Sequence, residues 1–165
     1  MTIIRCTRKL FSELRIKPDP DATTKEPGWH ANLLFVDHKK CILFTHDQTL
    51  FSFFRCGLTQ AEFAHLPEVF DQDLFKTLIQ FGFEQAQIER MLDQTREIHW
   101  AKTNNRNVLG SMNDMKHMLE WSINGAGGLM HTDQADLTRL LNETAFKATG
   151  YVYPVDRLRQ LLECL

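Results

Sequence analysis

The sequence predicts an α+β fold in which an antiparallel sheet of four or five strands packs against several helices. Segments rich in branched and aromatic residues follow one another through short links in the first third of the chain, as expected for strands. Later in the chain, apolar residues recur at helical spacing. The chain has 165 residues, of which 43% are hydrophobic and 24% charged. Because domains typically hold about 100–200 residues, we expect residues 1–165 to form one globular domain.

The strands are expected mostly before the helices. Residues 16–28 contain three prolines and are expected to form a surface loop, too short to separate two domains. Before it, Thr7 is placed to cap a short helix. The short links between the central segments favour an antiparallel meander. The predicted strands are residues 2–6, 30–37, 40–45, 49–55 and 97–103.

The helices are predicted from apolar stripes and from capping residues. Thr59 and Glu62 have the spacing of a capping box, which marks the start of a helix. The methionines of the longest helix are expected to fill the core. The other helices are predicted at residues 68–81, around 88–95, from about 107 to 124, after Thr132 or Asp133, and from Pro154 onward.

Composition limits the classes of function. Nineteen Lys and Arg oppose 21 Asp and Glu, so the formal net charge is −2 and any site for a polyanion must be local. No stretch approaches the roughly 20 apolar residues that a membrane span needs. The four cysteines are scattered, without a metal-binding or disulfide-rich spacing. We therefore expect a cytoplasmic protein with reduced thiols, no membrane association, no metal site and no cofactor.

The segment 101–114 is the strongest candidate for a ligand site. It runs from a predicted strand through an Asn-rich loop into the longest helix, so the first-turn amides would carry partial positive charge. Two basic residues bracket this helix start, which favours a phosphate or carboxylate. The candidate ligand-binding residues here are Lys102, Asn104, Asn105, Arg106, Ser111 and Asn113. The alternative is structural, because Asn residues often cap helices and Arg106 could pair with Asp114.

A second candidate cluster lies on the predicted sheet. His30 and Asn32 are two residues apart on a strand and therefore face the same side. Asp47 could approach His30 if the register of the meander allows it, and a His oriented by an Asp is suited to act as a general base. His30 is therefore the candidate catalytic residue. The alternative is a structural His beside an ordinary turn-forming Asp.

Several segments together resemble a known family. They are residues 3–7 (IIRCT), 29–33 (WHANL), 47–50 (DQTL) and 102–114 (KTNNRNVLGSMND). They resemble an uncharacterised bacterial domain-of-unknown-function family of short, free-standing proteins, over residue 2 to about residue 162. The resemblance implies no activity, substrate or cofactor, but it marks residues 101–114 as an important segment.

Three functions remain open from the sequence. The favoured hypothesis is a non-enzymatic binding or regulatory protein that recognises a phosphate-bearing ligand, nucleic acid or an acidic protein surface at the start of the 107–124 helix. The first alternative is a small enzyme acting on phosphodiesters or nucleotides, with His30 as general base. The second is an oligomerisation or antitoxin-like partner protein, in which a homo-oligomer would form through an exposed apolar patch.

Overall fold

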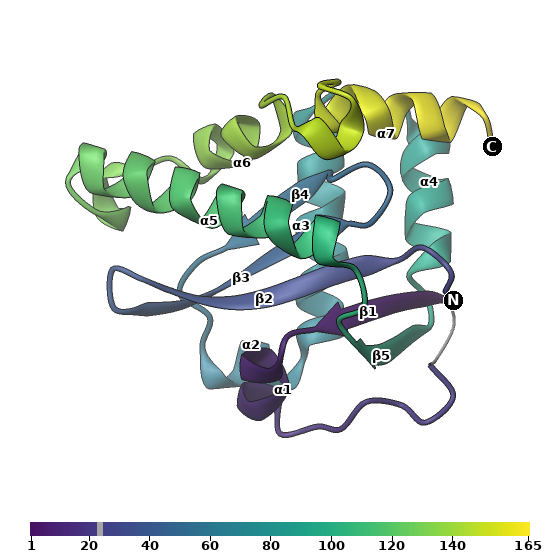
Figure 1. Ribbon diagram of the computed structural model, residues 1–165, viewed down its shortest axis with the longest axis horizontal. Coiled ribbons are helices and arrows are strands. Elements are labelled where there is room, and N and C mark those ends of the chain that lie inside the picture. The colour runs from purple at the N-terminus through teal and green to yellow at the C-terminus, as the bar shows by residue number, and fades with distance from the viewer. Residues whose placement is uncertain (23–24) are drawn as a thin grey trace.

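Five strands form one sheet in the order β4-β3-β2-β1-β5. The computed structural model describes residues 1–22 and 25–165. Figure 1 shows the sheet running through the middle of the molecule, with helices around it. The strands are β1 (Thr2–Cys6), β2 (Trp29–Val36), β3 (Lys39–His46), β4 (Ser52–Arg55) and β5 (Ile98–Lys102).

The sheet is mixed, so the prediction of an antiparallel sheet is wrong for one part of it. β2, β3 and β4 form the predicted antiparallel meander. β1, in contrast, runs parallel to both β2 and β5. A parallel pair needs a long crossover connection, and residues 7–28 supply one between β1 and β2. β5 returns after three helices to the free side of β1, which leaves β1 near one edge of the sheet.

In the part of the chain that the structure describes, seven α-helices surround the sheet, and the α+β class is confirmed. The predicted capping box is present, with Thr59 and Glu62 each bonding the other's backbone amide. Gly82 follows α3 with a φ of 71°, a left-handed conformation that glycine adopts without strain. The helices are α1 (Arg8–Leu14), α2 (Gln60–Ala64), α3 (Leu66–Gln80), α4 (Gln85–Gln94), α5 (Arg106–Ala126), α6 (Gln134–Asn142) and α7 (Pro154–Glu163).

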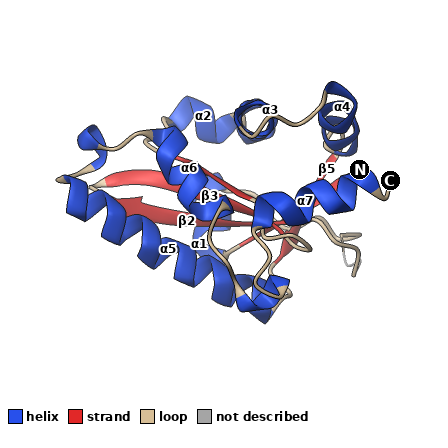
Figure 2. Cartoon of the chain, turned by 90° about the horizontal axis from the view of Figure 1, so that it is seen from above, coloured by secondary structure: helices blue, strands red, loops and turns tan. Residues whose placement is uncertain are grey.

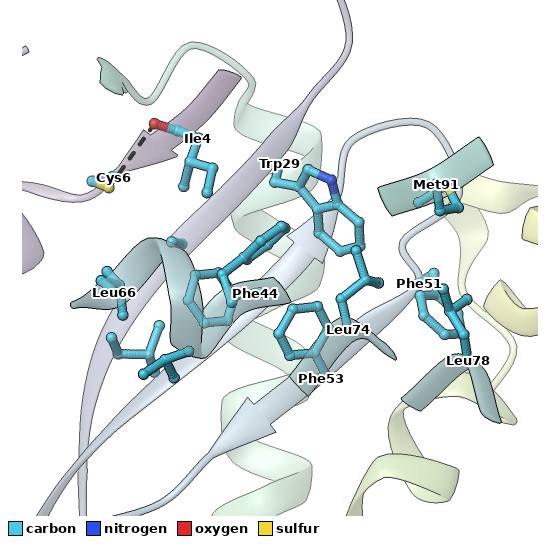
Figure 3. Close-up of a cluster of buried hydrophobic side chains, with 14 of the residues drawn as sticks. Ile4, Cys6, Trp29, Phe44, Phe51, Phe53, Leu66, Leu74, Leu78 and Met91 are labelled. Atoms are coloured by element: carbon cyan, nitrogen blue, oxygen red, sulfur yellow. Dashed lines mark hydrogen bonds between the residues drawn. The ribbon is translucent and has the colours of Figure 1, made fainter. Parts of the chain in front are cut away.

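Helices cover both faces of the sheet and bury a separate apolar cluster on each. Figure 2 shows α2, α3 and α4 on one side and α5 on the other. On the α3 side, Trp29, Phe44 and Phe53 pack closely, and the Phe44 and Phe53 rings stack with their centroids 5.0 Å apart (Figure 3). On the α5 side, Met112 and Met115 are buried against the sheet, as expected for core residues. Because both faces are covered, the strands are apolar on both sides.

A row of polar side chains crosses the sheet on the α5 side. Arg5, His30, Thr45 and Ser52 are successive partners across β1, β2, β3 and β4, and all four are buried. The hydroxyls of Thr45 and Ser52 lie 2.9 Å apart. Asn142 of α6 accepts from the Ser52 amide at 2.8 Å and donates to the Ser52 carbonyl at 2.7 Å. We call the four strand residues Arg5, His30, Thr45 and Ser52 the polar row.

The segment after α1 lies along β5. Within the predicted loop 16–28, residues 16–22 and 25–28 contain no helix or strand, whereas residues 23–24 lie outside the described residues. Asp19 holds the loop in place, since its amide donates to the Trp100 carbonyl and its carboxylate accepts from the Trp100 amide, each at 2.8 Å. These two bonds place the loop beside β5 and the residues that follow it.

Candidate functional site

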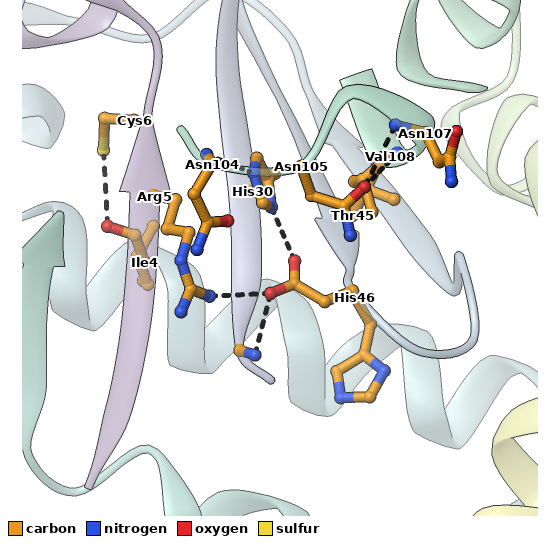
Figure 4. Close-up of polar contacts among 12 residues, drawn as sticks. Ile4, Arg5, Cys6, His30, Thr45, His46, Asn104, Asn105, Asn107 and Val108 are labelled. Atoms are coloured by element: carbon orange, nitrogen blue, oxygen red, sulfur yellow. Dashed lines mark hydrogen bonds and ion pairs between the residues drawn. The ribbon is translucent and has the colours of Figure 1, made fainter. Parts of the chain in front are cut away.

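A buried ionic cluster joins the first three strands. Arg5 is the fourth residue of β1 and lies directly beside His30 of β2, and Asp47 follows the last residue of β3. The Arg5 guanidinium donates to one Asp47 oxygen at 2.7 Å, and His30 Nδ1 lies 2.6 Å from the other (Figure 4). The Gly28 amide also donates to Asp47, at 2.9 Å. Asp47 thus binds three partners from two strands and the loop before β2.

Both ring nitrogens of His30 have partners. Nδ1 contacts Asp47, and Nε2 accepts a long 3.5 Å hydrogen bond from the Asn104 amide. The tautomer that satisfies both contacts carries its proton on Nδ1. The side chain is fully buried. The arrangement predicted for a general base is therefore present, but neither nitrogen is open to a ligand, and the ring connects Asp47 with the segment before α5.

Asp47 is held in its charged form by this cluster. Burial alone would raise the pKa of Asp47, but hydrogen bonds from His30 and Gly28 and the charge of Arg5 outweigh it, so the pKa lies below its ordinary value. Arg5 also donates to the Glu26 carbonyl at 2.7 Å. A buried charge is tolerated only when it is paired and hydrogen-bonded in this way. The cluster fixes how the two loops beside it approach the sheet.

The start of α5 lies next to this cluster, since the Asn104 amide just before the helix contacts His30. Asn105 caps the helix, because its side-chain oxygen accepts from the amides of Asn107 and Val108. Two of the first-turn amides predicted to meet a ligand are therefore occupied by the cap. Lys102 and Arg106 are both exposed, and neither forms an ion pair with any residue that the structure describes.

A basic groove lies between α1, the 15–22 segment and the β5–α5 loop. It consists of two adjoining cavities of about 600 and 570 Å³ that share Lys17, Pro18, Lys102 and Thr103. Arg8 and Arg15 add two more cationic groups to the first cavity. The remaining lining residues are Arg5, Cys6, Phe11, Ser12, Ile16, Asp19, Pro20, Ala22, Ala101 and Asn104.

The groove carries an excess of positive charge beside apolar surface. Across residues 1–22 and 25–165, no carboxylate pairs with Arg8, Arg15, Lys17 or Lys102, and all four residues are exposed. Asp19, the one acidic residue in the described lining, is instead engaged by the Trp100 amide and approached by His99 at 3.6 Å. Such a groove attracts anions and offers an apolar surface to the rest of the ligand.

The structure brings only some of the predicted site residues together. Lys102 and Asn104 line the groove, and Asn104 also lines a smaller cavity of about 190 Å³ together with Asn105. His30 lies beneath them, bonded to the Asn104 amide. Arg106 is exposed on the first turn of α5 but does not line these cavities.

The remaining predicted residues lie elsewhere. Ser111 is buried on the face of α5 that packs against the sheet. Asn113 is exposed two turns along α5, where its amide nitrogen is 3.5 Å from His117. Asn32 shares the α5 side of β2 with His30, and its side-chain oxygen accepts from the Thr7 hydroxyl at 2.9 Å. These three residues do not contribute to the groove.

Several groove residues were not predicted from the sequence. Arg8 begins α1, and Arg15 and Lys17 follow it. A signal was present, because residues 8–17 hold four basic residues and one acidic residue. Arg5 was missed as well. Its signal was a lone charge inside an apolar strand, which calls for a buried counter-ion.

No set of described residues suggests a metal centre or a membrane span. Among residues 1–22 and 25–165, no three His, Cys, Asp or Glu side chains are grouped so that they could hold a metal ion. Over the same residues, each helix is too short or too polar to cross a bilayer.

Fold and site together define a small α+β protein with a buried Arg–Asp–His cluster beneath a basic groove. The chain belongs to the family DUF6933, a domain of unknown function, whose family model matches residues 3–157. No curated protein and no solved structure matches the chain. The family match therefore extends over both the cluster and the groove, and it assigns no activity to either.

Proposed function

We propose that this protein is a non-enzymatic binding protein that holds a compact phosphate-bearing ligand in the basic groove. The observation that carries the proposal is the set of four exposed cationic side chains, Arg8, Arg15, Lys17 and Lys102, around one partly apolar groove. Charge-assisted hydrogen bonds from Arg and Lys to phosphate are among the stronger polar contacts in proteins. The free cysteines accord with a cytoplasmic location, where thiols stay reduced.

The lining of the groove favours a ligand with a phosphate and an apolar or aromatic part. Phe11, Ile16 and Pro18 provide apolar contacts, while Ser12 and Thr103 provide hydroxyls. A nucleotide or a phosphate ester of similar size has both kinds of surface. Long duplex DNA fits less well, because the groove holds four exposed cations and no long basic stripe, and the formal net charge of the chain is −2.

The geometry favours binding over catalysis at this site. A general base must come within hydrogen-bond reach of the proton that it removes. His30 is fully buried with both ring nitrogens engaged, and no histidine lines the described part of the groove. Lys102, Thr103 and Asn104 can supply charge and hydrogen bonds to a ligand, and His30 supports this segment from below.

The proposal is tested by calorimetric titration of the protein with nucleoside mono- and diphosphates, pyrophosphate and inorganic phosphate. We expect one class of these probes to bind, with an affinity that falls as salt is added. Lys102→Ala and Arg15→Ala should each weaken that binding by roughly tenfold or more, which corresponds to the loss of one charge-assisted hydrogen bond.

The matched control is Lys9→Ala. Lys9 is exposed on α1 next to Arg8, but it does not line the groove. Its removal lowers the net charge by the same amount and should leave the affinity nearly unchanged. If none of the probes binds, or if Lys9→Ala weakens binding as much as Lys102→Ala, the groove is not the site and the proposal fails.

A further inference from the structure

Two cysteines far apart in the sequence lie side by side in the sheet. The β3–β4 ladder ends at the pair Ile42 and Arg55, and continuing its register by one residue places Cys41 opposite Cys56, which directly follows β4. Both side chains lie on the α5 side, because Cys41 belongs to that apolar cluster and Cys56 packs against it. The Cys56 thiol donates a hydrogen bond to Cys41. Both cysteines are reduced in this structure.

The backbone holds this pair at a spacing that suits a disulfide. Residues directly opposite each other in an antiparallel ladder have Cα atoms about 4.5–5.5 Å apart. Disulfides usually join Cα atoms about 4.4–6.8 Å apart, so the two sulfurs can bond without movement of the strands. Just beyond the pair, the Leu58 amide donates to the Lys40 carbonyl at 3.0 Å, which holds the two chains together on that side as well.

The pKa of Cys41 differs from that of Cys6, the other fully buried thiol. The hydrogen bond from Cys56 lowers the pKa of Cys41 to about 7, and the nearby charge of Lys39 acts in the same direction. The Cys41 thiol also donates to the Lys39 carbonyl at 3.5 Å. At Cys6, in contrast, burial raises the pKa of the thiol far above its ordinary value. The hydrogen bond that lowers the pKa of Cys41, together with burial, raises the pKa of Cys56 far above its ordinary value. The thiolate that is accessible near neutral pH is therefore that of Cys41, with Cys56 as its hydrogen-bond donor.

Cys56 provides the route by which a reagent can reach the pair. It is half-buried and lines a cavity of about 420 Å³ between β4, α3 and α6, whereas Cys41 is fully buried. Lys76 and Gln80 of α3 line the same cavity and can contact the polar groups of a small reagent. A half-buried cysteine that borders a cavity, next to a fully buried one, is the arrangement of an attacking and a resolving cysteine.

We propose that Cys41 and Cys56 form a redox-active dithiol that is oxidised to a disulfide by a low-molecular-weight disulfide of the glutathione type. In the first step, the Cys56 sulfur attacks one sulfur of the reagent while its proton passes to the Cys41 thiolate. The S–S bond of the reagent breaks and releases one thiolate, which takes the proton from Cys41. In the second step, the Cys41 thiolate attacks the Cys56 sulfur and displaces the second. The protein loses two electrons, the reagent gains them, and the two thiol protons end on the two released thiols.

The proposal is tested on the full chain with Cys164 replaced by serine, because Cys164 is exposed and would react independently. This Cys164→Ser protein is equilibrated in glutathione buffers of increasing oxidised fraction, and remaining thiols are then alkylated. Before alkylation, we expect the intact mass to lie two hydrogen atoms below that of the reduced protein. After alkylation and unfolding, peptide mapping should show a Cys41–Cys56 link and an alkylated Cys6. Adding Cys56→Ala should abolish the link.

Two outcomes would overturn the proposal. One is a stable adduct of glutathione on Cys56 with Cys41 still alkylated, which would show that the second step does not occur. The other is full alkylation of both residues at every buffer composition. Both are read on the protein that retains Cys41 and Cys56, so they do not depend on whether the Cys56→Ala variant folds. Circular dichroism before and after oxidation confirms that the fold is intact.

Discussion

Replacing Asp47 with asparagine should destabilise the protein strongly, because it removes one charge from the buried cluster without changing its shape. Asp47 has a side-chain exposure of 9% and Arg5 of 2%. The amide of asparagine cannot accept from all three present donors. If its oxygen faces Arg5 and Gly28, its nitrogen faces Nδ1 of His30, so the proton of His30 must move to Nε2. The proton on Nε2 then points at the Asn104 amide, which is also a donor. The opposite orientation places two donors against Arg5 and Gly28.

The size of the effect follows from this geometry. Breaking a buried ion pair by removing one partner costs about 3–5 kcal/mol. The lower end applies here, because Arg5 retains its bond to the Glu26 carbonyl. We therefore expect Asp47→Asn to lower the free energy of unfolding by about 3 kcal/mol at neutral pH. In a chain of this length that corresponds to a fall in Tm of about 6–12 °C.

The assay is urea unfolding followed by tryptophan fluorescence, with Trp29 buried next to the cluster, at neutral pH and at acid pH. The folded-state pKa of Asp47 lies below its unfolded value, so its contribution is present above about pH 4 and is lost as the pH falls through the folded-state pKa. The difference between the two proteins should therefore shrink in acid.

The control is Asp93→Asn. Asp93 is exposed and pairs with Arg96 one turn along the chain, an arrangement that contributes at most about 1 kcal/mol. If Asp47→Asn costs no more than this control, or if its effect is the same in acid as at neutral pH, the cluster does not stabilise the fold through a charged Asp47.

Two further substitutions test polar contacts described above. Asn142→Ala would leave the buried amide and carbonyl of Ser52 without their side-chain partner, and we expect a loss of about 2–5 kcal/mol in chemical unfolding. An unchanged stability would mean that water satisfies these groups. Asn105→Ala removes the cap of α5 and should cost about 1 kcal/mol by thermal unfolding. Asn107→Ala, two residues later and exposed, should cost clearly less; equal losses would contradict the capping role.

Local patterns predicted most of the elements of this fold. Thr59 identified one helix start, and Asp133, one of two candidate caps, another. Runs of branched and aromatic residues identified β2 and β3 to within one residue at each end. The direction of β1 could not be obtained in this way. Its five residues have the same composition whether the strand is parallel or antiparallel, and the direction follows from where the crossover packs, which is a long-range property.

The candidate site was predicted only where its residues are close in the sequence. Lys102 and Asn104 belong to one segment and both line the groove. Arg8, Arg15 and Lys17 meet that segment only because β1 and β5 are parallel neighbours and Asp19 holds the loop beside Trp100. Ser111 was included because of its position in a polar run, although helical geometry turns it toward the sheet.

The polar row helps to determine the register in which the strands pair. When both faces of a sheet are apolar and covered, neither face is exposed to solvent. Burial of apolar residues alone then does not disfavour a shift of the strand register by one residue. Such a slip of β2 would turn His30 toward the rings of Phe44 and Phe53 and separate it from Asp47. The four polar side chains therefore raise the free energy of shifted registers, so a sheet that is apolar on both faces forms with a single register.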